Sequence, residues 1–198
     1  MSDFAIYLRL GFDHITDPRG YDHILFVVAL CAVYTIRQWR QVLVLITAFT
    51  IGHSITLALA TLRLIDYNTA LVEWLIPVTI LITAISNFFY EEPKKRRSTA
   101  SGQPKMGWWR YGIALAFGLI HGMGFSNYLR SLLGREADII RPLLAFNIGL
   151  EIGQLLVVGL ILAVAYLVLD ALRVSRLRWT LVVSGIAAGM AISLLISK

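Results

Sequence analysis

The side chains of this sequence that could carry chemistry are imidazoles and carboxylates placed in or beside long apolar runs. Asp22 and His23 stand together in the stretch GYDHILF, directly before such a run, and His53, His121 and Glu151 lie within later runs. An ionisable side chain in hydrocarbon costs roughly 3 kcal/mol even on a lenient scale, so each one indicates a functional site. Imidazole and carboxylate suit borderline divalent metals such as Ni, Co, Zn or Cu(II), whereas a soft Cu(I) site would need a cysteine or methionine cluster.

These groups are expected at similar depths on one side of a membrane. At about 1.5 Å per residue, three of them lie about 12, 14 and 18 Å below the outer edge, in the order Glu151, His121 and His53. Asp22 and His23 lie at that edge, and Glu73 follows the start of its own run from the same side. We therefore predict that the side chains converge on a metal ion in the outer half of the membrane, with Glu73 at the entrance.

Further polar residues share helix faces with these groups, at spacings of three and four residues. They are Thr50, Ser54, Asn147 and Gln154. Two interpretations stay open for them. They either orient the metal ligands by hydrogen bonds or form ordinary hydrogen bonds between neighbouring helices.

The composition predicts an all-α membrane protein. Of 198 residues, 58% are hydrophobic and only 15% are charged, and the mean hydropathy is +0.72, whereas a soluble domain is about 25% charged. We expect one transmembrane domain over 1–198, a bundle of six helices after a short N-terminal periplasmic segment. The predicted spans are 21–36, 41–65, 71–90, 111–130, 143–168 and 178–196, each near the roughly 20 residues that cross a bilayer.

The basic residues predict the orientation and argue against a nucleic-acid partner. The net charge is +6, but 11 of the 18 lysines and arginines lie in the connections after the first, third and fifth spans. The positive-inside rule then puts a linker at 91–110 in the cytoplasm and both termini in the periplasm of a bacterial inner (plasma) membrane. The expected partners are membrane lipids and the metal ion; whether the chain forms a homo-oligomer stays open.

Four motifs in order make the chain similar to a known family. GxDHxLF opens the first run, TAFTxxHSxTL lies in the second, GLxHGxGF in the fourth and FNxGxExGQ in the fifth, and together they cover Gly11 to Gln154. In these motifs the chain resembles the HupE/UreJ family of membrane proteins, regarded as nickel or nickel/cobalt permeases. The residues to which the resemblance assigns metal recognition are His14, Asp22, His23 and His121.

The chain departs from the usual motifs of that family in two places. The first motif, commonly HPxxGxDH, reads HITDPRGYDH here, and the second, usually with two histidines and a closing glutamate, is reduced to HGMGF. These differences suggest a divergent branch in which His53 and Glu151 take over ligand positions.

The leading hypothesis is a permease that captures a divalent transition metal ion (Ni, Co, Zn or Cu) outside and passes it inward. The rival hypothesis is an intramembrane zinc hydrolase acting on a lipid or another membrane substrate, because three ligands and an open water position describe catalytic zinc. It ranks second, since the sequence has no H-E-x-x-H signature. A third reading, an assembly protein whose polar residues only join its own helices, predicts no metal.

Overall fold

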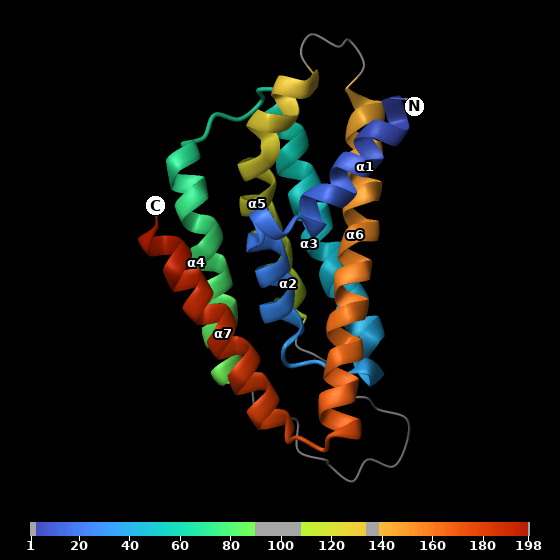
Figure 1. Ribbon diagram of the computed structural model, residues 1–198. Coiled ribbons are helices and arrows are strands. Elements are labelled where there is room, and N and C mark those ends of the chain that lie inside the picture. The colour runs from blue at the N-terminus through green and yellow to red at the C-terminus, as the bar shows by residue number, and fades with distance from the viewer. Residues whose placement is uncertain (1–2, 90–107, 134–138, 198) are drawn as a thin grey trace.

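The computed structural model describes residues 3–89, 108–133 and 139–197, and this part of the chain is helical without strands (Figure 1). The prediction of an all-α fold is thereby confirmed. The α-helices of the described residues are α1 Asp3–Thr16, α2 Asp22–Cys31, α3 Trp39–Thr61, α4 Thr69–Phe88, α5 Trp109–Leu133, α6 Ile140–Tyr166 and α7 Arg176–Ile196. Residues 91–107 of the predicted linker at 91–110 lie outside the described residues.

Four of these helices are long and apolar enough to cross a membrane. They are α3 with the short turn before it (Ile36–Thr61), α4, α6 with the π-helical turn after it (Ile140–Ala171), and α7. The predicted spans 41–65, 71–90, 143–168 and 178–196 correspond to them. The fourth predicted span, 111–130, corresponds to α5, which has 25 residues but is not among the helices apolar enough to cross a membrane, because glycines, His121 and Arg130 interrupt it.

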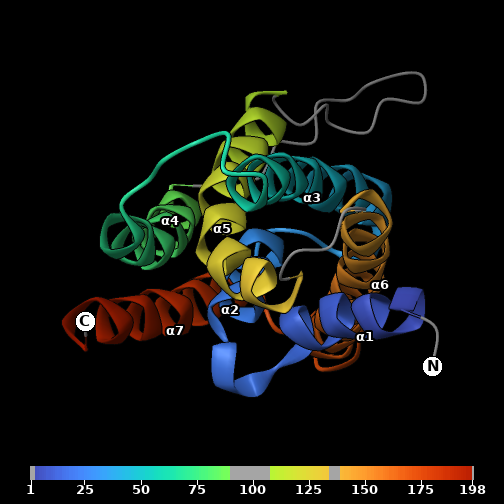
Figure 2. The same cartoon turned by 90° about the horizontal axis from the view of Figure 1, so that it is seen from above.

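The predicted first span, 21–36, is not confirmed as one helix, and neither is the count of six, since the described residues form seven α-helices. The helix there, α2, has only 10 residues and ends at Cys31, so it covers about 15 Å, half of the roughly 30 Å hydrocarbon layer. The N-terminal segment, expected as a short tail, forms the 14-residue helix α1 instead. The half-length helix α2 lies in the middle of the bundle, surrounded by the longer helices (Figures 1 and 2).

Side chains from other helices explain how α2 can end inside the protein. The Asn87 amide donates to the carbonyl oxygen of Ala29 at 2.7 Å, and the Thr180 hydroxyl donates to that of Ala32 at 3.2 Å. Backbone that leaves the helix at membrane depth is tolerated only where protein groups satisfy it. The end of α2 is therefore supported by side chains of α4 and α7. The residues next to α2 in the sequence give no sign of this support.

Glycines bring the helices of the site together in two pairs. A Cβ on Gly118 of α5 would overlap the Phe49 carbonyl of α3, and one on Gly122 would overlap the His53 carbonyl. On α6, a Cβ on Gly149 would overlap the Leu8 carbonyl of α1. Such small residues let helix backbones approach closely, so α3 docks on α5 and α1 docks on α6.

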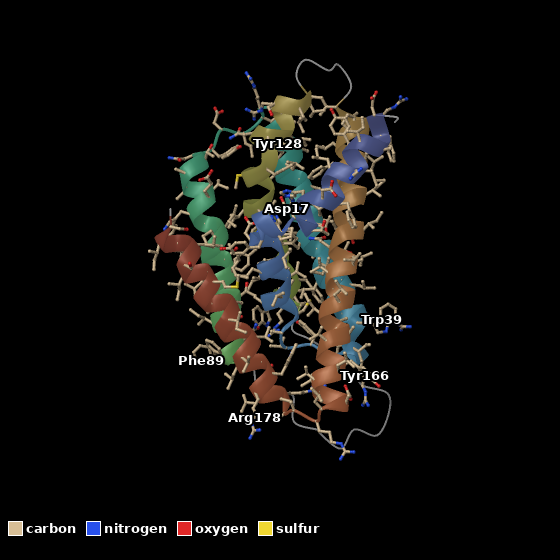
Figure 3. The ribbon with its side chains drawn as sticks, viewed as in Figure 1. Asp17, Trp39, Phe89, Tyr128, Tyr166 and Arg178 are labelled. Carbon is tan, nitrogen blue, oxygen red and sulfur yellow. The ribbon has the colours of Figure 1, made fainter. Side chains whose placement is uncertain are left out.

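The two ends of the bundle differ in their side chains. Tyr128 lies near one end, whereas Trp39, Phe89, Tyr166 and Arg178 lie toward the opposite end (Figure 3). The arginines of the connection between α6 and α7 and of the start of α3 are also at that opposite end, which we call the basic end.

A buried histidine cluster as candidate metal centre

Three histidines from three helices form a compact cluster near the end of the bundle opposite the basic end. His14 of α1, His23 of α2 and His53 of α3 each offer a nitrogen, and these atoms all lie within 4.8 Å of one another. The ring centroids are 4.6 Å apart for His14 and His23, 5.7 Å for His23 and His53, and 5.9 Å for His14 and His53. His23 and His53 are buried, and His14 is half-buried. We call these three residues the histidine cluster.

A fourth imidazole, His121 of α5, lies beside the cluster. It is fully buried, and its ring centroid is 5.1 Å from that of His23. The Thr79 hydroxyl of α4 lies 2.9 Å from His121 Nε2. Because this contact occupies Nε2, the nitrogen of His121 that stays open to a further partner is Nδ1.

The imidazole nitrogens of these histidines are buried without partners. In the described part of the chain this holds for Nε2 of His14 and His23, Nδ1 of His121, and both nitrogens of His53. Most buried polar atoms in native proteins have a hydrogen-bond partner, and leaving one unsatisfied costs about 1–3 kcal/mol. Several unpartnered nitrogen donors so close together are what a transition-metal ion would satisfy.

The protonation state of His14 also suits a metal. Helix α1 lies outside the candidate membrane spans. Burial, and next the neighbouring His23, lower the pKa of His14 well below its usual value. The ring is therefore neutral at pH 7 and keeps a lone pair, as a metal ligand requires.

Asp22 contacts the histidine that follows it. One carboxylate oxygen, Oδ1, accepts the backbone N–H of His23 at 2.8 Å and lies 3.0 Å from His23 Nδ1. Such a contact fixes the tautomer with hydrogen on Nδ1 and leaves Nε2 for a metal. Asp22 was predicted as a ligand; the geometry gives it the task of orienting His23, and direct ligation by Asp22 stays a prediction.

A cavity of about 700 Å³ leads to the cluster from the surface. Three of the histidines line it, namely His14, His23 and His121, and so do four carboxylates, Asp13, Asp17, Asp22 and Glu73. Asp17, in the connection between α1 and α2, lies in the upper half of the molecule in Figure 3. Carboxylates in a concave, low-dielectric site attract cations. Glu73 thus lies where an entrance residue should, whereas Asp13 and Asp17 were not foreseen as part of the cavity.

Glu151 and the polar residues of α6 lie in a different contact. Glu151 accepts a hydrogen bond from the Thr47 hydroxyl at 2.9 Å, and the Thr50 hydroxyl donates to the side-chain oxygen of Gln154. Asn147 Oδ1 has no partner among the described residues, and Ser54 is half-buried. The structure does not bring Glu151 into the histidine cluster, and its role as a metal ligand remains a prediction.

Sequence reasoning missed Thr79, and it expected His14 on a short N-terminal segment and not on a helix docked against α6. The sequence marks Thr79 only as a threonine within an apolar run, and several other threonines lie in such runs as well. The acidic and basic residues of α1 made it look like a solvated tail, although its Gly11 and Ile15 are buried against α6.

Long apolar helices, a half-length helix in their midst and a buried cluster of imidazoles define a polytopic helical membrane protein with a candidate transition-metal centre. The model of the family described as HupE / UreJ protein matches residues 1–197. The chain therefore belongs to the HupE/UreJ family, which is associated with nickel and cobalt transport. No curated protein and no solved structure matches this chain.

Proposed function

We propose that this protein binds a divalent transition metal ion at the histidine cluster and transports it inward across a bacterial inner membrane. The observation that carries the proposal is the group of three nitrogen donors within 4.8 Å of one another, contributed by α1, α2 and α3. The unpartnered state of these nitrogens and the membership in a family of transporters support it.

The cavity supplies a route by which a hydrated ion reaches the cluster. The ion first meets the carboxylates of Asp13, Asp17 and Glu73, then the imidazoles. Water ligands are exchanged for protein ligands stepwise, and binding must stay weak enough for release. His121, which lines the same cavity and lies beside His23, is placed to accept the ion next.

An aromatic layer closes the path on the side of the basic end. Each of three helices carries a phenylalanine about one turn from its histidine in that direction, namely Phe26 on α2, Phe49 on α3 and Phe117 on α5. The Phe26 and Phe49 rings stack at 4.7 Å, and the Phe117 ring is 6.1 Å from that of Phe26. We infer that these rings separate when the ion passes inward, toward the small inner cavity lined by Tyr34, Asn87 and Arg110.

The arginines support an orientation with the basic end in the cytoplasm. The histidine cluster and its cavity then open toward the periplasm, and both termini lie on that side. This agrees with capture of the metal outside and release inside.

Metal binding by purified protein tests the proposal most directly. Titration calorimetry with Ni²⁺, Co²⁺ and Zn²⁺ should detect a site in the wild type that His14→Ala, His23→Ala and His53→Ala each weaken by at least about tenfold. Cells expressing the wild type should accumulate one of these metals, and the His53→Ala, His121→Ala double variant should not. Unchanged accumulation by the double variant would falsify transport through this site.

The zinc hydrolase remains the second candidate because one observation favours it. Three imidazoles face a cavity on one side and are closed on the other by the aromatic layer, as three ligands and an open position are arranged in catalytic zinc sites. Stoichiometric zinc that survives purification, without metal uptake by proteoliposomes, would favour the enzyme. A readily exchangeable metal with uptake would favour the transporter.

A further inference from the structure

A small cavity at the basic end lies apart from the histidine cluster and its entrance. It has a volume of about 160 Å³, and its lining residues are Thr35, Arg37, Leu169, Asp170, Val174 and Arg176. The first two belong to the segment between α2 and α3. The others belong to the π-helical turn after α6, the following connection and the first residue of α7. We call this space the basic-end cavity.

The basic-end cavity lies at the ends of three candidate membrane spans. The span that contains α3 begins at Ile36, the span that contains α6 ends at Ala171, and α7 begins at Arg176. Trp39 and Tyr166 are both about half exposed and lie toward the same end (Figure 3). Aromatic side chains in such positions are typical of the head-group level of a bilayer. The cavity is therefore at the level where the phosphate groups of a membrane would lie.

One of the arginines of the cavity is held in place by a buried threonine. Nη2 of Arg176 donates to Thr35 Oγ1 at 3.2 Å, and the Thr35 hydroxyl in turn donates to Gln38 Oε1 at 3.4 Å. Thr35 is only 6% exposed, so the guanidinium group is oriented before any ligand binds. A guanidinium has five N–H donors in a planar fork that matches the oxygens of a phosphate.

Positive and negative side chains face the basic-end cavity together. Arg37, Asp170 and Arg176 all line it, yet Asp170 makes no ion pair with another described residue. Two guanidinium groups and a carboxylate around one space are complementary to a ligand that carries both signs of charge. A simple anion would instead lie beside the carboxylate of Asp170 and be repelled by it.

The phosphoethanolamine head group of a phospholipid carries this pattern of charges. Its phosphodiester offers a non-bridging oxygen to each guanidinium, and hydrogen bonds between guanidinium and phosphate are charge-assisted and strong. Its primary ammonium, a short distance along the head group, has N–H donors for a carboxylate. A choline head group has no N–H donor and a glycerol head group has no positive charge, so neither complements Asp170 as fully.

The surroundings of the cavity favour a lipid over a water-soluble ester of the same chemistry. Ile36, which precedes Arg37, is an exposed apolar residue, and so are Leu167 and Leu172 on either side of Asp170. At the end of a membrane span such side chains are placed to contact acyl chains, which a soluble phosphate ester lacks.

We propose that the basic-end cavity binds the head group of phosphatidylethanolamine, with the phosphate held by Arg37 and Arg176 and the ammonium held by Asp170. Basic pockets between membrane helices bind phospholipid head groups in other membrane proteins. A lipid bound here links the turn before α3 to the start of α7 and does not involve the histidine cluster. The proposal therefore stands independently of metal transport.

Lipid binding is tested on purified full-length protein that has been stripped of lipid in detergent. Native mass spectrometry should show phosphatidylethanolamine bound at least about fivefold more tightly than phosphatidylcholine or phosphatidylglycerol with the same acyl chains. Arg37→Gln and Arg176→Gln should each weaken that binding at least about fivefold. A wild type that binds either of the other two lipids as tightly would overturn the proposal.

The matched control for the arginines is Arg178→Gln. Arg178 lies on the same helix and at the same end as Arg176 and is also exposed, but it does not line the cavity. This variant should bind phosphatidylethanolamine within about twofold of the wild type. If Arg178→Gln weakens binding as much as Arg176→Gln does, the basic end attracts lipid through its general charge and the cavity is not a site.

Asp170→Asn tests the contact with the ammonium group separately. Asp170 is exposed, so this variant is expected to fold even if an arginine variant does not. It should lose the preference for phosphatidylethanolamine over phosphatidylglycerol while it still binds phosphatidylglycerol at least as tightly as the wild type. A preference that survives in Asp170→Asn contradicts the assigned role of the carboxylate and with it the choice of lipid.

Competition distinguishes a lipid from a soluble phosphate ligand. Glycerophosphoethanolamine and inorganic phosphate carry the same groups without acyl chains, so neither should displace the bound lipid at a concentration about 100 times that of the lipid. Displacement by either compound at a concentration similar to that of the lipid would assign the cavity to a soluble phosphate and overturn the proposal.

Discussion

At the scale of single residues, two of the four imidazoles, His23 and His121, have one ring nitrogen occupied by a neighbouring side chain, as an oriented metal ligand would. Asp22 lies against Nδ1 of His23, and Thr79 lies against Nε2 of His121. These contacts orient the rings and leave one chosen nitrogen of each without a partner. Contacts of this kind influence metal sites nearly as strongly as the ligands themselves.

If Asp22 orients His23, we expect that changing Asp22 weakens metal binding less than removing His23 does. Asp22→Asn keeps the size of the side chain but removes its charge, so the imidazole of His23 loses its strongest acceptor. Metal affinity measured by calorimetry should fall roughly 10- to 100-fold, less than in His23→Ala, which removes the ligand. A loss as complete as that of His23→Ala would indicate that Asp22 itself binds the metal.

Thr79 can be separated from its neighbours on α4 by a matched pair of variants. Thr79→Val removes the hydroxyl that contacts His121 and should lower the initial rate of metal uptake by cells several-fold. Thr69→Val, at the start of α4, removes a hydroxyl that accepts a hydrogen bond from Asn127 and should leave uptake close to the wild type. Equal effects of both variants would show that α4 stability, and not His121, is responsible.

At the scale of the helices, close backbone packing determines which imidazoles meet. Gly118 and Gly122 let α5 lie directly on the stretch of α3 that carries His53, and Gly149 lets α1 lie on α6. The apolar α1–α6 contact includes Ile15, which is 1% exposed and follows His14 directly in the chain. The position of His14 therefore depends on α6 even though no residue of α6 belongs to the histidine cluster.

Because α1 packs directly on Gly149 of α6, we predict that a methyl group added at this glycine weakens metal binding, although Gly149 is not a metal ligand. Gly149→Ala forces α1 away from α6 and should lower the free energy of unfolding by about 1–3 kcal/mol through overpacking. It should also weaken metal binding, because His14 moves with α1. Gly159→Ala, on the same helix, meets nothing within 4 Å and serves as the control in both thermal unfolding and calorimetry. Equal metal affinity in the two variants would contradict the role of α1.

At the scale of the whole molecule, the histidine cluster joins helices from both docked pairs. α1 belongs with α6, α3 belongs with α5, and α2 lies between them in the middle of the bundle (Figure 2). A metal held by His14, His23 and His53 would thus cross-link parts of the protein that otherwise meet through few polar contacts. The hydrogen bonds from Thr47 to Glu151 and from Thr50 to Gln154 join the same two pairs at a second level.

This arrangement predicts stabilisation by the metal. At a free metal concentration about 100 times the dissociation constant, linkage adds about 2.7 kcal/mol to the free energy of unfolding. The Tm of the detergent-purified wild type should rise on adding the metal and fall again with a chelator. The His14→Ala, His23→Ala, His53→Ala triple variant should show neither change. A shift retained by the triple variant would place the stabilising metal elsewhere.

Much of this protein follows from local properties of its sequence. Hydropathy is a sum over a short window, so the all-α character and the segments of α3, α4, α6 and α7 could be predicted without tertiary information. Depth along a helix follows from a constant rise per residue, so the convergence of His23 and His53 near one side was predictable as well.

The lateral arrangement could not be obtained in the same way. The end of α2 at Cys31 is supported by Asn87 and Thr180, which lie 58 and 148 residues from the carbonyls they bind. The bond of Glu151 to Thr47 joins positions 104 residues apart, and His14 reaches the cluster only because Gly149 admits α1. A sequence window carries no record of such partners, because they are selected by which backbones can approach and which buried polar groups must be satisfied. The sequence alone therefore determined which polar side chains lie within long apolar helices and how far along each helix they lie, and the tertiary structure decided which of them meet.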